Sequence, residues 1–334
     1  MLRLFTLLCV LLSAVPAGAG ETVARIKKDG IVRCGTRTVP AAYVYVEDKE
    51  TKGVDAEFCS AVATAITGRP EAYTMINVPD GIKALFDGRV DLLLGGTPWT
   101  PLREFAADVT MPETLYHSGF SFIGKYNPDA TSMRSYAGSR VCVEQRPFAV
   151  KALEDYNRRF SLDFRIMGLP SLVRAKELLY IGRCDLVFEA REVLHSEYFK
   201  KAPEKIDLVV LPEIVHPYTT GPIVLESDVE FKKILRRLIQ GLVKAEEKGV
   251  TAQNVEDFQS TDDPEIRALL AEDKNSALKN GVDPKWLYRT IAEKGNYGEI
   301  FSRSMGDKSM LKMNRAMNKL TRDGGKISAP SFEE

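Results

Sequence analysis

The feature that most constrains the fold of this chain is a short pattern that occurs twice. Gly-Arg-x-Asp-Leu begins at Gly88 and again at Gly182, 94 positions later. In each copy a segment with helical spacing precedes the glycine, which can take the left-handed conformation that ends a helix. An apolar run that suits a buried strand follows. The expected helix and strand cover 82–87 and 89–94 in the first copy, and 172–179 and 183–188 in the second.

A second pair of expected strands has the same relationship. Ile-Val-Arg-Cys at 31–34 matches Arg-Val-Cys-Val at 140–143, and the cysteines of this pair, Cys34 and Cys142, lie 108 positions apart. Two repeated patterns at similar offsets predict two lobes built on one α/β plan. The length of 334 residues agrees, since it corresponds to about two domains, and 44% apolar residues can fill two cores.

The two lobes are not expected to be consecutive in the chain. Residues 119–124 alternate like a strand before a polar loop, and residues 207–211 form another strand before a segment rich in proline and glycine. We interpret these places as two crossings between lobes, which together form a hinge; one linker between consecutive domains is the alternative. The expected ranges are 20–123 and 222–305 for lobe I with a C-terminal helical extension, 124–221 for lobe II, and 306–334 for a C-terminal tail.

Beyond the second crossing the sequence predicts helices. Apolar residues at helical spacing over 231–243 predict a long amphipathic helix, which Gly249 ends. Asp-Pro pairs at 263–264 and 283–284 are typical helix starts. From Asn318 the chain is polar and contains glycine, so we expect it to fray.

Residues 1–19 predict a secretory signal peptide. A basic start at Arg3 precedes an uncharged apolar run over 4–15, which is too short to cross a bilayer, and small residues at 17–19 suit cleavage. A lipoprotein signal acylated at Cys9 is the alternative, although two leucines stand where it would need small residues. The mature protein is therefore expected in the periplasm.

Export leaves four cysteines in the mature chain, Cys34, Cys59, Cys142 and Cys184. An oxidising compartment favours disulfides, and four cysteines allow three pairings; four buried free thiols are the alternative. A metal site is not favoured, because no two cysteines have the C-x-x-C spacing and the three histidines lie far away. We expect no cofactor.

Charge and motifs argue against several classes of function. The 46 basic residues balance the 46 acidic ones, so the chain has no electrostatic footprint for nucleic acid. The sequence contains no phosphate-binding loop, zinc-protease motif or nucleophile elbow, and His117, His195 and His216 are isolated. We therefore expect a protein that is not an enzyme.

One loop has the residues of a binding site. Residues 95–103 (Gly-Gly-Thr-Pro-Trp-Thr-Pro-Leu-Arg) follow an expected strand, at the end where open α/β sheets bind ligands. A glycine lets a ligand approach the backbone, a threonine offers a hydroxyl, tryptophan can wall a pocket, and arginine can hold a carboxylate. Tyr43 or Tyr45, after the first strand, can stack on a ligand in the same cleft; simple packing and a surface turn are the alternatives. The candidates in the loop are Gly96, Thr97, Trp99 and Arg103.

Segments spread over nearly all of the mature chain match one family in order. They lie at 31–35, 53–62, 99–103, 141–143, 182–185, 211–214, 249–255 and 295–301. In these segments the chain resembles the family 3 periplasmic solute-binding proteins of ABC importers, and most closely the general L-amino-acid-binding proteins. The resemblance implies a type II periplasmic binding protein, or Venus flytrap: two α/β lobes, a two-stranded hinge, and a ligand closed between the lobes.

The resemblance also implies details of the site and of the partners. It implies one disulfide in each lobe, Cys34–Cys59 and Cys142–Cys184. It implies that a ligand carboxylate is held by Arg103, helped by backbone N–H groups from both lobes. It further implies a monomer that carries a small solute to an ABC permease in the inner membrane.

Three positions depart from the family pattern. Pro98 stands where Ser or Thr is usual, Arg-Pro-Phe at 146–148 replaces a Gly-Thr-Thr anion loop, and Ala190 replaces the Asp that holds the ligand's ammonium group. Proline has neither a hydroxyl nor an N–H. Glu189 is not expected to substitute for the missing Asp, because neighbouring strand residues point to opposite faces. Each lost charge-assisted contact leaves about 1.5–3 kcal/mol unmade, enough in sum to weaken a micromolar ligand to millimolar.

These departures leave three hypotheses. The protein binds a different small solute, with Arg103 kept as an anion site and Arg146, Phe148 and Glu189 in a remade opposite wall. Alternatively, a standard amino acid binds in a changed pose. The third hypothesis is a periplasmic accessory protein that binds another protein and has lost amino-acid binding.

Overall fold

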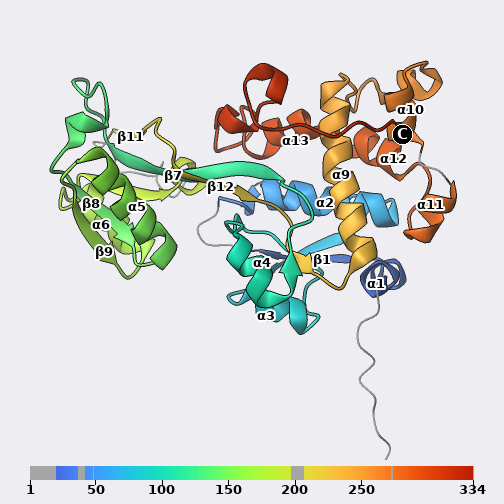
Figure 1. The fold of residues 1–334 in the computed structure, drawn as a ribbon, viewed down its shortest axis with the longest axis horizontal. Coiled ribbons are helices and arrows are strands. Elements are labelled where there is room, and N and C mark those ends of the chain that lie inside the picture. Colours follow the sequence, from blue (N-terminus) through green and yellow to red (C-terminus); the bar gives the residue numbers. More distant parts are fainter. Residues whose placement is uncertain (1–19, 37–41, 48, 197–206, 272–273, 334) are drawn as a thin grey trace, which may run out of the picture.

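A ribbon of two long antiparallel strands, β7 (Tyr116–Lys125) and β12 (Val215–Thr220), joins the two lobes of the protein (Figure 1). This computed structural model describes residues 20–36, 42–47, 49–196, 207–271 and 274–333. The expected signal peptide, residues 1–19, lies outside the described residues. The expectation of a two-lobed α/β fold with a two-stranded hinge is confirmed. No helix in the described ranges is long and apolar enough to cross a bilayer.

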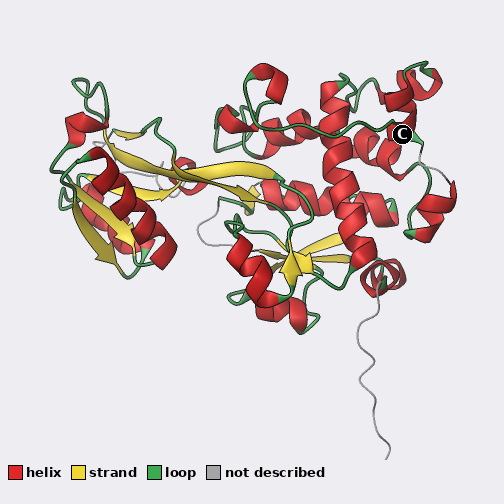
Figure 2. Ribbon diagram, in the orientation of Figure 1, coloured by secondary structure: helices red, strands yellow, loops and turns green. Residues whose placement is uncertain are grey.

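Lobe I is a small parallel sheet surrounded by helices (Figure 2). Its strands lie in the order β4-β1-β5. The long helix α9 (Val229–Glu247) has the predicted amphipathic face, because the side chains at 231, 234, 235, 238, 239 and 242 are buried. The other elements of this lobe are β1 (Val32–Thr36), β4 (Tyr73–Asn77), β5 (Leu92–Leu93), α1 (Glu21–Asp29), α2 (Val54–Thr67), α3 (Gly81–Phe86), α4 (Pro101–Ala107) and the short pairs β2 (Tyr45–Glu47) with β3 (Glu50–Lys52) and β6 (Val109–Thr110) with β13 (Val224–Leu225).

Lobe II is built around a sheet in the order β11-β7-β10-β8-β9, with β12 on the edge of β7. Residues 120–125 of β7 pair with β10 and β11, so they belong to the sheet of lobe II. The sequence assigned residues up to 123 to lobe I. The structure differs because one continuous strand runs from the hinge into the sheet, so no turn marks the crossing. The elements of this lobe are β8 (Arg140–Glu144), β9 (Arg165–Leu169), β10 (Leu186–Ala190), β11 (Leu208–Val210), α5 (Pro147–Phe160), α6 (Leu172–Tyr180) and α7 (Arg191–His195).

The repeated Gly-Arg-x-Asp-Leu pattern makes the same contact in both lobes. Asp91 accepts hydrogen bonds from the N–H of Arg33 at 2.7 Å and from its Nη2 at 3.0 Å. Asp185 accepts from the N–H of Arg140 at 2.8 Å and from its Nη2 at 2.7 Å. Each aspartate therefore ties the strand that follows it to the neighbouring parallel strand, which explains why the pattern occurs twice.

The two copies of this contact differ in burial, and this difference predicts unequal effects of mutation. The side chain of Asp91 is 2% exposed, whereas that of Asp185 is 41% exposed. We expect Asp91→Asn to lower the free energy of unfolding by about 1.5–3 kcal/mol, the range for hydrogen bonds to a charged group. Asp185→Asn should cost clearly less, because exposed ion pairs contribute little. Urea denaturation of both variants measures this, and equal losses would contradict it.

Both predicted disulfides are present. Cys34 of β1 is bonded to Cys59 of α2, and Cys142 of β8 is bonded to Cys184 just before β10. The two bonds are not equivalent by the repeat. In the first copy Leu92 lies opposite Cys34, whereas in the second copy the matching Leu186 lies opposite Val141. Cys142 is therefore one residue beyond the position equivalent to Cys34.

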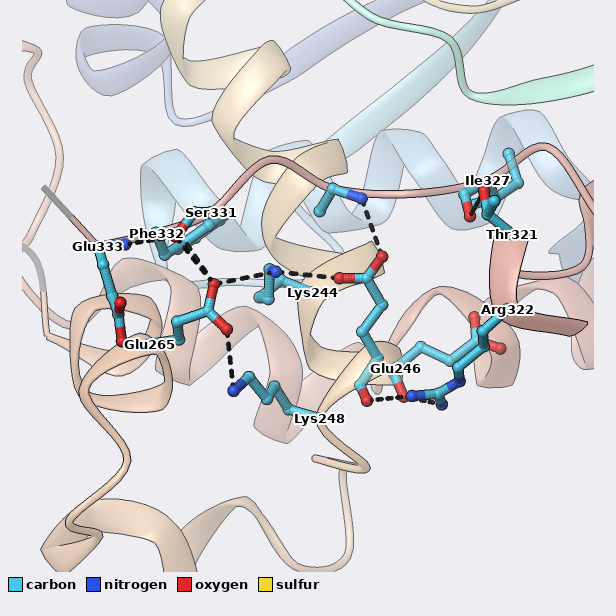
Figure 3. A network of polar contacts seen from close by, with 12 residues as sticks. Lys244, Glu246, Lys248, Glu265, Thr321, Arg322, Ile327, Ser331, Phe332 and Glu333 are labelled. Carbon is cyan, nitrogen blue, oxygen red and sulfur yellow. Dashed lines mark hydrogen bonds and ion pairs between the residues drawn. The ribbon is translucent and has the colours of Figure 1, made fainter.

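The chain from Asn318 does not fray, and that prediction is wrong. Residues 306–333, here called the C-terminal strap, run across α9 on lobe I (Figures 1 and 3). Leu320, Ile327 and Phe332 of the strap are buried. Isolated apolar residues in a polar segment have no periodic pattern. The sequence therefore did not predict that the strap packs against lobe I. Before the strap lie α10 (Pro264–Leu270), α11 (Lys274–Lys279), α12 (Trp286–Lys294) and α13 (Tyr297–Ser304).

The end of the strap is attached to Glu265 of α10 (Figure 3). This carboxylate accepts from the N–H of Phe332 at 3.2 Å and pairs with Lys248 at 2.9 Å and Lys244 at 3.1 Å. Lys248 first and then Lys244 lower the pKa of Glu265 from 4.5 to about 2. Since this folded-state pKa lies below the ordinary one, the contribution of Glu265 is complete above pH 4.5 and is lost as pH falls toward 2.

A Glu265→Gln variant tests this attachment. We expect wild-type protein to lose thermal stability between pH 4.5 and pH 2 partly through this group, and we expect the variant to lose less over the same interval. The measurement is the melting temperature of both proteins at a series of pH values. Parallel curves for the two proteins would count against a role of Glu265 in acid sensitivity.

Candidate ligand-binding cleft

A cavity of about 740 Å³ lies between the lobes, lined by residues of both lobes and of the hinge. This volume suits a small organic solute. A larger, open hollow of about 820 Å³ surrounds Tyr45, Glu57 and Lys294, but it draws its lining residues from one side of the hinge only. Seven predicted site residues line the cavity between the lobes: Tyr43, Gly96, Thr97, Arg103, Arg146, Phe148 and Glu189.

The lobe I wall of the cavity is the loop 95–103. The N–H of Gly95 donates to the buried carboxylate of Asp55 at 2.7 Å, which fixes the start of the loop. A Cβ on Gly96 would lie 2.2 Å from the ring of Tyr43, and Gly96 has a φ of +62°, so only glycine fits here. These contacts hold the loop against the tyrosine that forms the adjacent part of the wall.

Arg103 lies in the first turn of α4 and lines the cavity. The helix starts there because the Thr100 side chain accepts from the N–H of Arg103 at 3.3 Å and Pro101 occupies the first position. The guanidinium donates through Nη1 to the carbonyl of Pro98. The proline that lacks the usual hydroxyl and N–H therefore still orients the arginine through its carbonyl oxygen.

The lobe II wall carries a cluster of one cation and two carboxylates that pair with one another. Arg146 pairs with both oxygens of Glu189, and its Nε lies 2.9 Å from Glu144. Burial opposes the charge of Arg146, but the two glutamates outweigh burial and raise its pKa. The carboxylate of Glu189 is 3% exposed and also accepts from the N–H of Ala190 at 2.7 Å. The lobe II wall of the cavity therefore contains an internal ion pair between Arg146 and Glu189.

The expectation that Glu189 and Ala190 face opposite ways does not hold for the cavity, because both residues line it. Ala190 is the last residue of β10 and the N-cap of α7, with φ −57° and ψ 138°. Strand alternation ends at this position. The long side chain of Glu189 also reaches Arg146, which the β8–α5 connection presents to it.

Aromatic residues that the sequence did not single out form the floor of the cavity. Phe120 lies where β7 enters the sheet of lobe II, and Tyr218 comes from β12 of the hinge; the Phe148 ring lies 5.8 Å and 6.2 Å from their rings. Burial raises the pKa of Tyr218 well above its usual range. The sequence offered no signal for Phe120 and Tyr218, because strand residues that pack in a core have the same pattern.

Trp99 does not line this cavity. It borders a neighbouring hollow of about 330 Å³, together with His117 and His216. The backbone N–H of Trp99 donates to the backbone carbonyl of Thr219 in β12 at 2.9 Å. The structure therefore places Trp99 where its loop meets the hinge, and a direct contact between its side chain and a ligand remains a prediction.

Two α/β lobes, a hinge of two strands and a cavity between the lobes define a two-lobed solute-binding protein. The chain belongs to the bacterial extracellular solute-binding proteins, family 3, which it matches over residues 32–326. The suspected family is thereby confirmed. The relatives are named as binding proteins, so the expectation that the chain is not an enzyme is confirmed as well.

Relatives of similar length support the assignment. The general L-amino acid-binding periplasmic protein AapJ of Rhizobium johnstonii is 29% identical over 327 residues, which cover 96% of this chain and 95% of AapJ. The glutamate/glutamine/aspartate/asparagine-binding protein BztA of Rhodobacter capsulatus is 28% identical over 329 residues, 97% of each chain. A periplasmic binding protein from Brucella ovis, solved with glutathione bound, has a TM-score of 0.83 and 29% identity, covering 93% of this chain and 99% of that one.

Proposed function

We propose that this protein is the periplasmic substrate-binding component of an amino-acid-type ABC importer. In this proposal it binds a small polar or anionic solute between its lobes and delivers it, as a monomer, to the permease. The solute is not a standard α-amino acid in the usual pose. The fold, the cavity and the family support the coarse function, and the charges of the cleft support the choice of solute.

The observation that carries the choice of solute is the ion pair of Arg146 and Glu189. In the family pattern the second lobe supplies groups for the carboxylate and ammonium of an amino acid. Here the guanidinium of Arg146 and the carboxylate of Glu189 pair with each other. Ala190, at the position of the ammonium-binding aspartate, supplies no charge. An α-amino acid would have to break this pair, which would leave the buried carboxylate of Glu189 without its partner.

The solute class that suits this cleft is larger than an amino acid and carries a carboxylate. Arg103 offers a planar cation on lobe I, while Phe120, Phe148 and Tyr218 offer apolar contact area. The relative from Brucella ovis was solved with glutathione, an anionic peptide. Glutathione is therefore the first solute to test on this chain.

Thermal shift and calorimetry on the mature protein test the proposal. Reduced and oxidised glutathione are compared with the twenty standard amino acids at equal concentration. A solute at about 100 times its Kd stabilises by about 2.7 kcal/mol, which raises Tm by several degrees. We expect such a rise with an anionic peptide and none with the amino acids.

Two other outcomes would change the conclusion. A rise of several degrees with a common amino acid would contradict the claim that usual amino-acid recognition is lost. If no small solute changes Tm, and a periplasmic pull-down captures a protein other than an importer permease, the accessory function replaces transport. The observation that supports this second function is that Ala190 stands in place of the ammonium-binding aspartate.

A further inference from the structure

At one residue pair, His117 of β7 and Thr219 of β12, both outer edges of the two-stranded hinge form hydrogen bonds to other parts of the protein. His117 of β7 lies opposite Thr219 of β12. The His117 N–H donates to Oδ1 of Asn318 at 2.6 Å, and its carbonyl accepts from Nδ2 of Asn318 at 2.9 Å. On the other edge, the carbonyl of Thr219 accepts from the N–H of Trp99 at 2.9 Å. One side-chain amide therefore satisfies the edge of β7 in the way that a neighbouring strand would.

Asn318 is itself fixed to lobe I by the C-terminal strap. It is 4% exposed. The backbone carbonyl of Asn318 accepts from Nη2 of Arg315 at 2.8 Å, and Arg315 also pairs with Glu246 of α9. Four residues further on, Arg322 donates to the carbonyl of Glu247 at 2.6 Å. The strap thus connects the hinge at His117 to the central helix of lobe I.

The hinge is irregular directly beyond this clamped pair. The register between β7 and β12 shifts between Val215 and Tyr218, and His216 has a φ of +48°, which few residues other than glycine adopt. Opposite this bulge lies Gly119, where a Cβ would approach the side chain of Ile214 to 2.6 Å. Bulges disrupt the ladder and bend a strand, so this is where the two strands can change direction most easily.

We infer that Asn318 is a positioning residue for lobe closure. It holds the paired part of the hinge, at His117 and Thr219, rigidly to lobe I. The lobes consequently rotate about Gly119 and the bulge at 215–217, and the cleft closes along one path. The inference concerns the protein without solute and holds whichever solute the cleft binds, so it can fail while the proposed function stands.

The test is the distribution of lobe separations in the ligand-free protein. Spin labels are placed at Lys28→Cys on α1 and Glu154→Cys on α5, both exposed sites in different lobes. The labels are placed on the chain without residues 1–19, whose four cysteines stay protected as buried disulfides. We expect Asn318→Ala to broaden the distance distribution measured by pulsed electron paramagnetic resonance. We also expect hydrogen exchange at the His117 amide to become at least tenfold faster.

Two further variants separate the hinge role from general loosening of the strap. Ser331→Ala removes an exposed hydroxyl at the far end of the strap, 3.2 Å from Glu265, and should leave the distances unchanged. Asn318→Asp keeps the size of the side chain and the acceptor for the His117 N–H but loses the donor, so it should also broaden the distribution. An unchanged distribution in a folded Asn318 variant, or equal broadening in Ser331→Ala, would overturn the inference.

Discussion

Arg103→Ala should abolish binding of an anionic solute in the cleft, with a loss of affinity of about 100-fold or more. A bidentate contact between a guanidinium and a carboxylate is charge-assisted, and its loss costs about 3 kcal/mol, which corresponds to about two decades in Kd. Among the residues that line the cavity, the cations are Arg103 and Arg146. Since Arg146 is already paired with both Glu189 and Glu144, we expect the carboxylate of a solute to depend on Arg103.

Two companion variants make this prediction specific. Arg103→Lys keeps the charge but loses the planar fork, and should weaken binding by an intermediate amount. Arg89→Ala removes an arginine that is half exposed on lobe I and does not line the cavity, and it should bind as wild type does. Calorimetry with the solute identified in the thermal-shift screen gives the Kd values, and wild-type affinity in Arg103→Ala would remove Arg103 from the site.

Removal of the Cys142–Cys184 disulfide should lower the free energy of unfolding by about 4 kcal/mol, by the chain-entropy relation for a separation of 42 residues. The Cys34–Cys59 bond closes a shorter loop, with a separation of 25, and should contribute about 3.5 kcal/mol. Both values are a large part of the stability of an ordinary domain. The expected fall in Tm for each double Cys→Ala variant is roughly 8–15 °C.

Scanning calorimetry of the two double variants measures these losses, and wild-type protein treated with a reductant serves as the comparison. Because each bond lies within one lobe, each variant should destabilise its own lobe, which hydrogen exchange can resolve. A fall in Tm of less than about 2 °C for either variant would show that the bond adds no stability.

Much of the fold could be predicted from local patterns. The two copies of Gly-Arg-x-Asp-Leu predicted the two α/β lobes, and each aspartate makes the same contact to an arginine of the neighbouring strand. The apolar spacing from Phe231 predicted α9. These predictions succeed because helix ends, strands and amphipathic faces depend on residues that are close in the sequence.

The candidate site could be predicted only in part. Gly96, Thr97 and Arg103 of the loop, together with Arg146 and Phe148, line the cleft, since they sit at strand ends where this fold gathers its ligand groups. Trp99 borders the neighbouring hollow instead, and its backbone N–H donates to the carbonyl of Thr219 in the hinge. The pairing of Arg146 with Glu189, 43 positions apart, has no signature in either segment alone.

The sequence by itself determined the class of fold, its family and the pairs of cysteines that the family implies. Tertiary structure alone decided that Arg146 and Glu189 neutralise each other and that Asn318 binds the hinge, 201 positions away at His117. The physical reason is that such contacts depend on the three-dimensional path of the chain. Polar side chains have no periodicity that reveals their partners, and only the folded backbone brings those partners within hydrogen-bonding distance.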